Sequence, residues 1–330
     1  MKITRAHVGT TRGHAGQGPT AVDAYTLDAG PALCVTVWTY GATLVETLVP
    51  GRDAERQNVT VRLPDLDAYE DRTRNPYVGA TMGRFSRCIA RGRLRIGGRE
   101  HRLDRNVGEH HFHGGSIGFD RYVWQAGAER AGDELVLRLS LESADGDQGY
   151  PGALSAQVQY RVHADGRLAF RYSARTTAST VVGLTNHAYW NLAGKDGIDG
   201  HRLSVNAGRV VGVDGALIPA GPLLQTAGTP LDFRVPRQIG RLELDHCYAL
   251  DHAGPAAELH DRASGRTMRV QTDQPALAVY SGEGLRPPRA GLCLQATALP
   301  DAPNRPDFPS ARLEPGECYR QETVHHFFVG

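Results

Sequence analysis

Hydrophobic and polar residues alternate with a period of two along much of the chain. Residues 135–141 place a leucine at every second position, as expected of a strand with one well-buried face. Residues 158–162 and 168–172 alternate in the same way, and Asp165-Gly166, a dipeptide favoured in tight hairpins, lies between them. These patterns predict antiparallel β-hairpins.

Two further turns extend the pattern. Gly97-Gly98 and Ser264-Gly265 each separate short alternating runs, and only residues 63–71 resemble a short helical turn. No long helical stripe separates the strands. We therefore predict an all-β chain built from antiparallel sheets. No linker, repeat or low-complexity tract marks a domain boundary.

Charge and cysteine content exclude several classes of function. The 37 basic and 36 acidic residues give a formal net charge of +1, so nothing in the overall charge favours nucleic acid or an anionic membrane as partner, and a small neutral ligand suits it better. No apolar run has the length of a signal peptide or membrane helix, so we expect a soluble, cytoplasmic protein. The five cysteines are scattered and never spaced CxxC, which argues against a disulfide framework and a zinc knuckle.

The most conspicuous cluster of candidate residues is EHHFHGG, residues 109–115. Histidine is both a common metal ligand and a group that exchanges protons near neutrality. His111 and His113 at positions i and i+2 of one strand face are suited to a shared ion, but no carboxylate follows until Asp120. The spacing therefore favours histidines without a metal.

A second cluster surrounds His187 in LTNHAYWNL, residues 184–192. Asn186 supplies hydrogen-bonding groups and Tyr189 a flat apolar face, which together suit a sugar-like ligand, although Tyr and Trp on a strand are more often part of the core. Asp245 lies in a polar break beside a strand. Gln295 lies where an apolar strand gives way to a proline-rich loop.

Taken together, these segments resemble the aldose 1-epimerase, or galactose mutarotase, family over nearly the whole chain. The matching blocks occur in the family's order: YGATL, VGATMGRF, HGGSIGFDRYVW, DGDQGYPG, TNHAYWNL, GTPLDFR, LDHCYAL, TDQP, LPDAPNRPDFP and LEPGE. The resemblance implies one domain spanning residues 1–330, folded as a large antiparallel β-supersandwich. It also implies an open sugar-binding cleft without metal or organic cofactor.

The family's chemistry is ring opening and closing at an anomeric carbon. A general base takes the proton of the anomeric hydroxyl while a general acid protonates the ring oxygen, and each contributes roughly 10²–10⁴-fold. The resemblance implies that His187 is the acid and that His113 hydrogen-bonds at the anomeric end. It also implies that Asp245 and Gln274 bind sugar hydroxyls.

Two positions depart from the family pattern. Gln295 stands where the family has its glutamate base, and an amide cannot accept a proton at physiological pH. Cys88 stands where the family has a ligand-binding arginine. Arg84 and Arg87 are the candidates to replace that arginine, although neighbouring strand residues face opposite ways, which argues against simple replacement by Arg87.

Another group must then supply the base, if the reaction is retained. The candidates are Glu283, Asp307 and a neutral His113 or His111. A histidine base works only above its own pKa, so it predicts an activity that rises with pH near neutrality. A profile that stays flat down to about pH 5 would count against histidine.

Three hypotheses remain open from the sequence. The first is a mutarotase-like isomerase with a rearranged base, acting on a sugar or sugar-like cyclic hemiacetal. The second is a different proton-transfer reaction, such as cyclisation, isomerisation or elimination, on a non-standard biosynthetic substrate. The third is a non-catalytic carbohydrate-binding protein. In each case the expected partner is a small molecule, and the chain is expected to be a monomer or a homodimer.

Overall fold

The computed structural model describes residues 1–14, 16–251 and 253–330, and nearly all of them belong to β-strands or their connections. The strand pairs of the large sheets are antiparallel. The prediction of an all-β, antiparallel chain is therefore confirmed. No helix of this part of the chain is long and apolar enough to cross a membrane.

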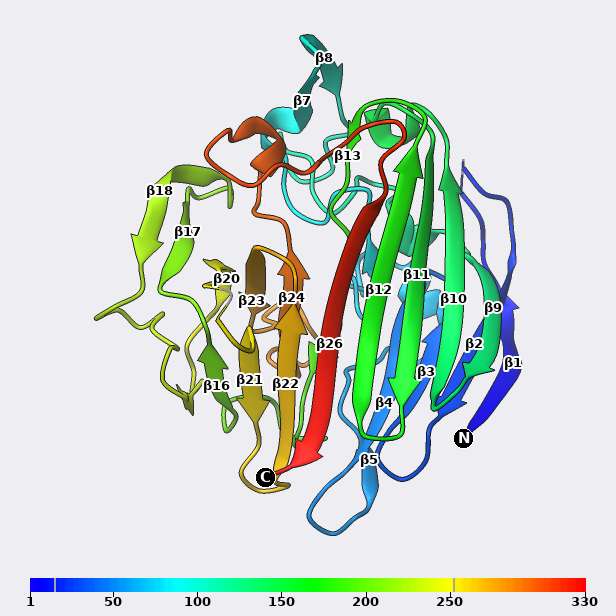
Figure 1. Cartoon of the computed structure of the whole chain (residues 1–330), viewed down its shortest axis with the longest axis vertical. Helices are drawn as coiled ribbons and strands as arrows, with labels where there is room; N and C mark the ends of the chain where they lie inside the picture. Colours follow the sequence, from blue (N-terminus) through cyan, green and yellow to red (C-terminus); the bar gives the residue numbers. More distant parts are fainter. Residues whose placement is uncertain (15, 252) are drawn as a thin grey trace.

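Two large sheets pack face to face (Figure 1). The first has five strands in chain order, namely β1 (Lys2–Thr10), β2 (Ala21–Asp28), β3 (Cys34–Trp38), β4 (Thr43–Pro50) and β5 (Arg56–Asn58). The second has nine strands, in the spatial order β19 (Arg237–Gln238), β16 (Arg202–Val205), β21 (Ala257–His260), β22 (Arg266–Thr272), β26 (Tyr319–Val329), β12 (Arg167–Thr176), β11 (Leu154–His163), β10 (Glu134–Ser143) and β9 (Gln125–Ala131).

The period-two pattern identified these strands because alternate residues of each face the main core. Leu135, Leu137, Leu139 and Leu141 of β10 are all buried in this core, which also contains residues of β2 and β3. The predicted hairpin is β11–β12, with Gly166 at a φ of 88° in its turn. The turns at Gly97-Gly98 and Ser264-Gly265 also join paired strands, β7 (Arg93–Ile96) to β8 (Arg99–Arg102) and β21 to β22.

The helical content is small. The expected helical turn is α1 (Leu66–Glu70), whose N-cap Asp65 accepts a hydrogen bond from the Ala68 amide at 2.8 Å. The other helical segments of the described residues are four single 3-10 turns: Ala90–Gly92, Phe119–Arg121, Asp147–Gly149 and Ala302–Asn304.

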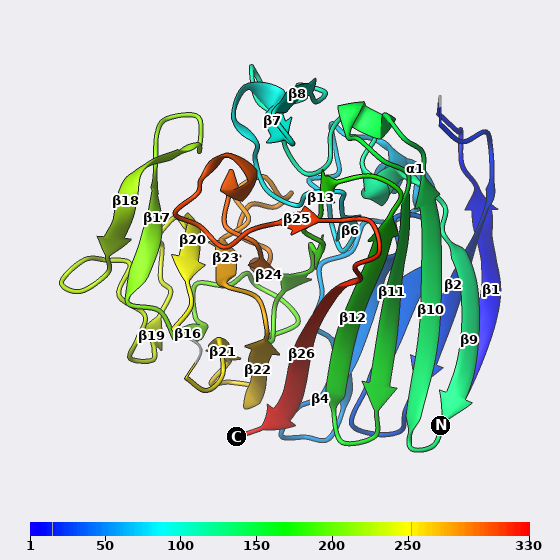
Figure 2. The same cartoon turned by 45° about the horizontal axis from the view of Figure 1, so that its top comes forward.

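A third sheet of six strands lies beside the sandwich, with β17 and β18 at its outer edge (Figures 1 and 2). Its order is β15 (Tyr189–Trp190), β24 (Leu292–Thr297), β23 (Ala276–Tyr280), β20 (Asp245–Ala249), β17 (Arg209–Val213) and β18 (Pro219–Gln225). Two short ladders border it, β6 (Thr81–Met82) with β14 (Thr185–Asn186) and β13 (Thr180–Val181) with β25 (Arg312–Leu313). This sheet and the β6–β14 ladder carry the candidate site.

Candidate functional site

The histidine cluster changes direction at His113. His111 forms a bridge with Ile89 through two backbone hydrogen bonds of 2.9 and 3.2 Å. The backbone then turns, with a φ of 51° at His113 and 90° at Gly114. A Cβ atom at Gly114 would lie 1.7 Å from the Gly83 carbonyl oxygen, so only glycine fits. His111 and His113 consequently do not share a strand face.

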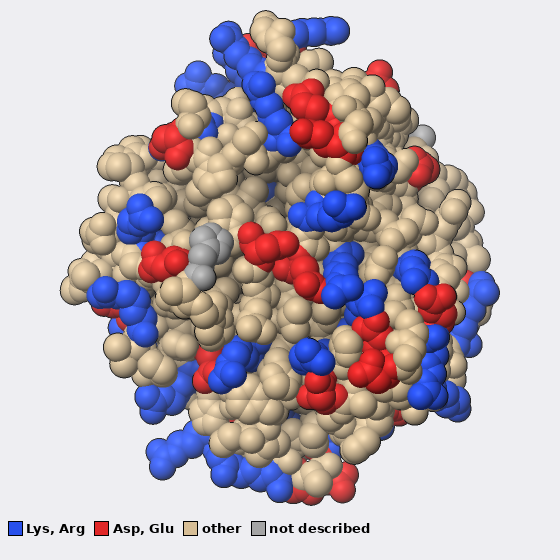
Figure 3. Space-filling model, in the orientation of Figure 1, with Lys and Arg blue, Asp and Glu red and all other residues tan. Residues whose placement is uncertain are grey.

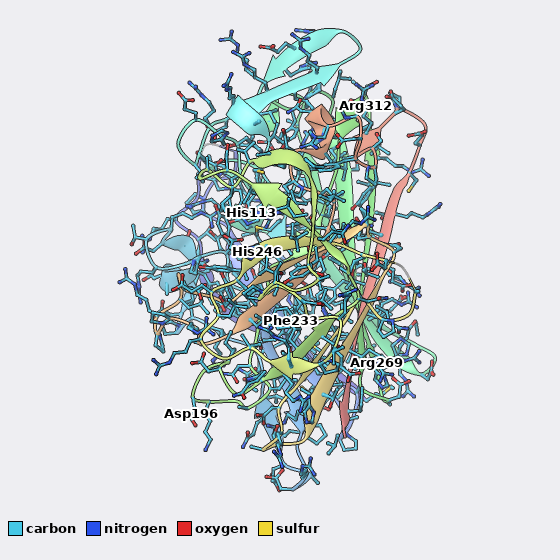
Figure 4. All side chains as sticks on the ribbon, turned by 90° about the vertical axis from the view of Figure 1, so that its left-hand side faces the viewer. His113, Asp196, Phe233, His246, Arg269 and Arg312 are labelled. Carbon is cyan, nitrogen blue, oxygen red and sulfur yellow. The ribbon has the colours of Figure 1, made fainter. Side chains whose placement is uncertain are left out.

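The His113 ring is buried within a cluster of aromatic rings. Its Nδ1 hydrogen-bonds the Ser86 carbonyl oxygen. A carbonyl can only accept, so Nδ1 carries the proton and, in the neutral ring, Nε2 presents a lone pair. Tyr77 meets the ring edge-on at a centroid distance of 4.7 Å. Figure 4 shows His113 inside the molecule, above His246 of β20.

His187 lies between β14 and β15 and contacts His113 directly. The two rings are nearly perpendicular, at 87°, with centroids 5.3 Å apart. The backbone of His187 is held on both sides, because its amide donates to Ala80 and its carbonyl accepts from Gly79. Its Nδ1 lies 3.4 Å from Sγ of Cys293.

Three strands form one wall of the site through their register. Asp245, Tyr280 and Cys293 stand directly opposite one another across β20, β23 and β24, and Cys247, Ala278 and Gln295 form the next row on that face. Gln295 is 2% exposed, and its Oε1 has no hydrogen-bond partner. A buried amide oxygen in this condition is ready to accept a hydrogen bond from a ligand.

The positive charge of Arg87 influences the ionisation of His113, His187 and Asp245. Its side chain is buried, and its Nε has no hydrogen-bond partner. Burial lowers the pKa of His187 to about 3 and that of His113 well below its usual value, and Arg87 adds to both shifts. Burial raises the pKa of Asp245, which Arg87 only partly opposes. Both histidines are therefore neutral at neutral pH.

Arg84 and Cys88 do not occupy the same place as Arg87. The guanidinium of Arg84 is fully engaged elsewhere, with Ser143, Ala144, Pro151 and Gly152, so it is not available to a ligand. The thiol of Cys88 donates weakly to the Leu217 carbonyl at 3.5 Å, on the connection between β17 and β18. Burial raises its pKa to about 12.

His111 and Asn186 have structural partners that occupy their polar atoms. Nδ1 of His111 donates to the Asp104 carbonyl at 2.6 Å, and its Nε2 accepts from the Tyr150 hydroxyl at 2.7 Å. The Asn186 amide donates to Gly79 and Tyr160 and accepts from the Ala188 backbone. The expectations that His111 serves as a base and that Asn186 binds substrate are therefore corrected.

Gln274 and Glu283 also differ from expectation. Gln274 precedes β23, at the opposite end of that strand from Asp245, and its amide donates to Asp273. The residue opposite Gln295 is Ala278, which has no polar group. Glu283 does lie near Asp245, whose pKa it raises, but its Oε1 already accepts from Ser281 and Arg289. Gln274 is therefore misplaced, and Glu283 is an ion-pair partner rather than a free base.

Tyr189 packs against the ring of His187. Its hydroxyl donates to the Pro76 carbonyl at 2.9 Å, and its ring lies 5.0 Å from that of His187. Because it is 1% exposed and its hydroxyl is occupied, it packs the histidine rather than facing a ligand.

Three site residues were missed by the sequence reasoning. Tyr77 contacts both histidines and lies under the guanidinium of Arg72, at 4.2 Å. Arg72 is ion-paired with Asp120. Cys293 was considered only as one of five scattered cysteines, and its place two residues before Gln295 on the same strand was the signal that could have identified it.

The site residues are largely buried. His113, His187, Gln295 and Arg87 are only 2, 4, 2 and 7% exposed. A surface cavity of about 770 Å³, lined by Thr60, Arg62, Lys195 and Arg286 among others, lies elsewhere. Within residues 1–14, 16–251 and 253–330, no group of three or more His, Cys, Asp or Glu residues is arranged to hold a metal ion.

The chain is similar to aldose 1-epimerases and galactose mutarotases over nearly its whole length. The aldose 1-epimerase family model matches residues 23–326. The galactose mutarotase of Rattus norvegicus is 33% identical, with 100% of this chain and 99% of that protein covered. The aldose 1-epimerase of Escherichia coli K12 is also 33% identical, over 92% and 94% of the two chains. The crystal structure of galactose 1-epimerase from Lactobacillus acidophilus superposes with a TM-score of 0.87 at 26% identity, covering 100% and 99%.

Proposed function

Because the chain belongs to the aldose 1-epimerase family, we propose that it is a cofactor-independent isomerase that opens and recloses a cyclic hemiacetal of a sugar or sugar-like metabolite. The observation that carries the proposal is the contact between His113 and His187, two buried neutral histidines whose rings are 5.3 Å apart. Such a pair can serve both ends of a proton transfer within one substrate.

His113 is the proposed base. Its Nδ1–H donates to the Ser86 carbonyl, which leaves the Nε2 lone pair as the acceptor. Its lowered pKa keeps that lone pair unprotonated at neutral pH. Gln295 cannot take a proton, so it is assigned to binding the substrate, as is Asp245 at the other end of the wall.

His187 is the proposed acid, and Cys293 is its positioning residue. Burial raises the pKa of the Cys293 thiol well above its usual value, so the group keeps its hydrogen and can donate it to Nδ1 of His187. The proton of the neutral His187 ring is then on Nε2, where it can hydrogen-bond the ring oxygen of the substrate. The two histidines therefore present opposite tautomers, one accepting and one donating.

Mutarotation of freshly dissolved α-D-galactose and α-D-glucose, followed by polarimetry, tests this proposal. The wild type should accelerate the change in rotation, and His113→Gln and His187→Gln should each lose about 10²–10⁴-fold. His7→Gln, at an exposed position on β1, is the matched control. A His113→Gln enzyme with unchanged kcat/KM would remove His113 as the base.

The two other hypotheses predict different results. Binding of sugars by calorimetry without turnover would favour a carbohydrate-binding protein. Tight binding of a non-sugar metabolite, with no effect on any sugar, would favour a different proton-transfer reaction.

A further inference from the structure

Among the residues that the structure describes, Arg87 is a buried arginine without a hydrogen-bond or ion-pair partner. Three arginines of the described chain are at least nine-tenths buried, and two of them, Arg84 and Arg266, donate from every guanidinium nitrogen to oxygen atoms of the protein. Arg87 is 7% exposed, its Nε is shielded from solvent without an acceptor, and its guanidinium forms no ion pair within residues 1–14, 16–251 and 253–330. Arginine remains charged in proteins, so this cation is uncompensated.

The position of Arg87 is inside the proposed catalytic centre. Its charge acts on four groups of that centre, namely His113, His187, Asp245 and Cys293. Asp245 does not neutralise it, because the two form no ion pair and burial makes ionisation of that carboxyl less favourable. The amide oxygen of Gln295 is likewise unpartnered in the same centre. The site therefore lacks an anion and a hydrogen-bond donor, and a ligand can supply both.

From these observations we infer that the substrate is an acidic sugar: Arg87 binds a carboxylate, while Gln295 accepts a hydrogen bond from a hydroxyl of the same molecule. That the ligand is a sugar rests on the proposed function. That it carries a carboxylate rests on Arg87 alone. The planar guanidinium matches a carboxylate with two parallel hydrogen bonds. The near-zero net charge of the whole chain, which favoured a neutral ligand, averages over a surface of interspersed charges (Figure 3) and says nothing of this one interior cation.

A carboxylate fits the local charge better than a phosphate does. The other nearby cation, Arg72, is already ion-paired with Asp120, so Arg87 supplies the one positive charge left free near the histidines among the described residues. A phosphate carries nearly two negative charges, of which this one cation would compensate only one.

Binding of a carboxylate also prepares the histidines for catalysis. Arg87 is one of the causes of the lowered pKa of His113 and His187. A bound anion neutralises it, so the pKa of both rings rises when the substrate is present. The Nε2 lone pair of His113 is then a stronger base only when an acidic substrate occupies the site.

The test compares sugars that differ only in charge. Binding by calorimetry and anomer exchange by NMR are measured with D-galacturonate and D-glucuronate, their neutral methyl esters, D-galactose, D-glucose and the two hexose 6-phosphates. We expect kcat/KM for the uronates to exceed that for their esters by at least about 100-fold, the loss typical of an unpaired buried charge contact. Equal values for uronate and ester, or a preference for the phosphates, would overturn the inference.

Variants locate the effect at Arg87. Arg87→Met should abolish the preference for uronate over ester, Arg87→Lys should retain part of it, and Arg175→Met, at an exposed position on β12, should leave it unchanged. A preference that survives Arg87→Met overturns the assignment. The wild-type comparison stands even if the Arg87 variants fail to fold.

The outcomes separate this inference from the proposed function. Uronate binding that requires Arg87 but occurs without anomer exchange supports the anionic ligand and rejects the isomerase. Anomer exchange of neutral hexoses as fast as that of uronates supports the isomerase and rejects the anionic ligand. Absence of both binding and exchange for every sugar rejects both.

Discussion

The His113 ring meets the His187 ring at 87°, and each is held through its own Nδ1, one by the Ser86 carbonyl and the other by the Cys293 thiol. Fixing Nδ1 determines what Nε2 can do, because a neutral imidazole carries only one proton. With the tautomers proposed above, His113 accepts and His187 donates a proton at Nε2, provided that both rings stay neutral.

The pH dependence of activity follows from that neutrality. Burial lowers the pKa of His187 to about 3 and moves that of His113 in the same direction. The base must be unprotonated, so kcat/KM for a neutral sugar should stay constant as pH falls from about 8 through 6.5, the ordinary histidine value, and decline only below it. An activity that halves near pH 6.5 would contradict this result. A pH profile that is flat near neutrality would argue against an exposed histidine as the base. It does not argue against this buried histidine, because burial lowers its pKa.

Gln295→Glu tests whether the base was lost or replaced. If His113 already serves as the base, adding a carboxylate should raise kcat/KM for galactose by less than about tenfold. If the base is missing, the gain should approach the 10²–10⁴-fold contribution of general base catalysis. Gln295→Met, which removes the amide without adding a charge, is the control for its binding role.

Cys293→Ala tests the tautomer of His187. Removing the thiol leaves Nδ1 without its partner, and a hydrogen bond of about 1 kcal/mol corresponds to a loss of roughly fivefold to tenfold. The loss should fall on kcat rather than KM, because Cys293 acts only through His187. The ¹⁵N chemical shifts of the His187 ring should report mixed tautomers in Cys293→Ala and a single one in the wild type. Unchanged shifts would show that Cys293 only fills space.

Most of the scaffold could be predicted from sequence, because β10, β11 and β12 bury alternate residues and glycine marks their turns. The site could be predicted only in part. Residues 83–89 form bends and isolated bridges instead of a regular strand, so the alternation that argued against Arg87 does not apply there. Gln274 was misplaced because a motif gives position along the chain, whereas cross-strand register decides that Ala278 faces Gln295.

Gly114→Ala should destabilise the fold strongly. The new methyl group would need the space of the Gly83 carbonyl oxygen, 1.7 Å away, at a φ of 90° that alanine disfavours. Gly108→Ala provides the matched control, since Gly108 also has a positive φ, 55°, but open space around its Cα. We expect a loss of about 1 kcal/mol for the control from backbone strain and several times that for Gly114→Ala, measured by urea denaturation.

His325→Leu should make stability less sensitive to acid. Both ring nitrogens of His325 are buried without a partner, and the ring packs against Phe170 and Trp190. Burial lowers its pKa to about 3. In the unfolded chain the same group titrates near 6.5, so below that pH the unfolded state binds a proton that the folded state does not, and stability falls until about pH 3.

From pH 7 to pH 5 this single group removes about 2 kcal/mol of the free energy of unfolding. His325→Leu should therefore lose about 2 kcal/mol less than the wild type over that interval in urea denaturation. The remaining decline should persist, because His111 and His187, whose pKa values burial lowers to about 4 and about 3, respond to acid in the same direction. His7→Leu, at an exposed position, should retain the wild-type difference. Equal pH dependence in His325→Leu and the wild type would mean that His325 gains a proton without unfolding the core.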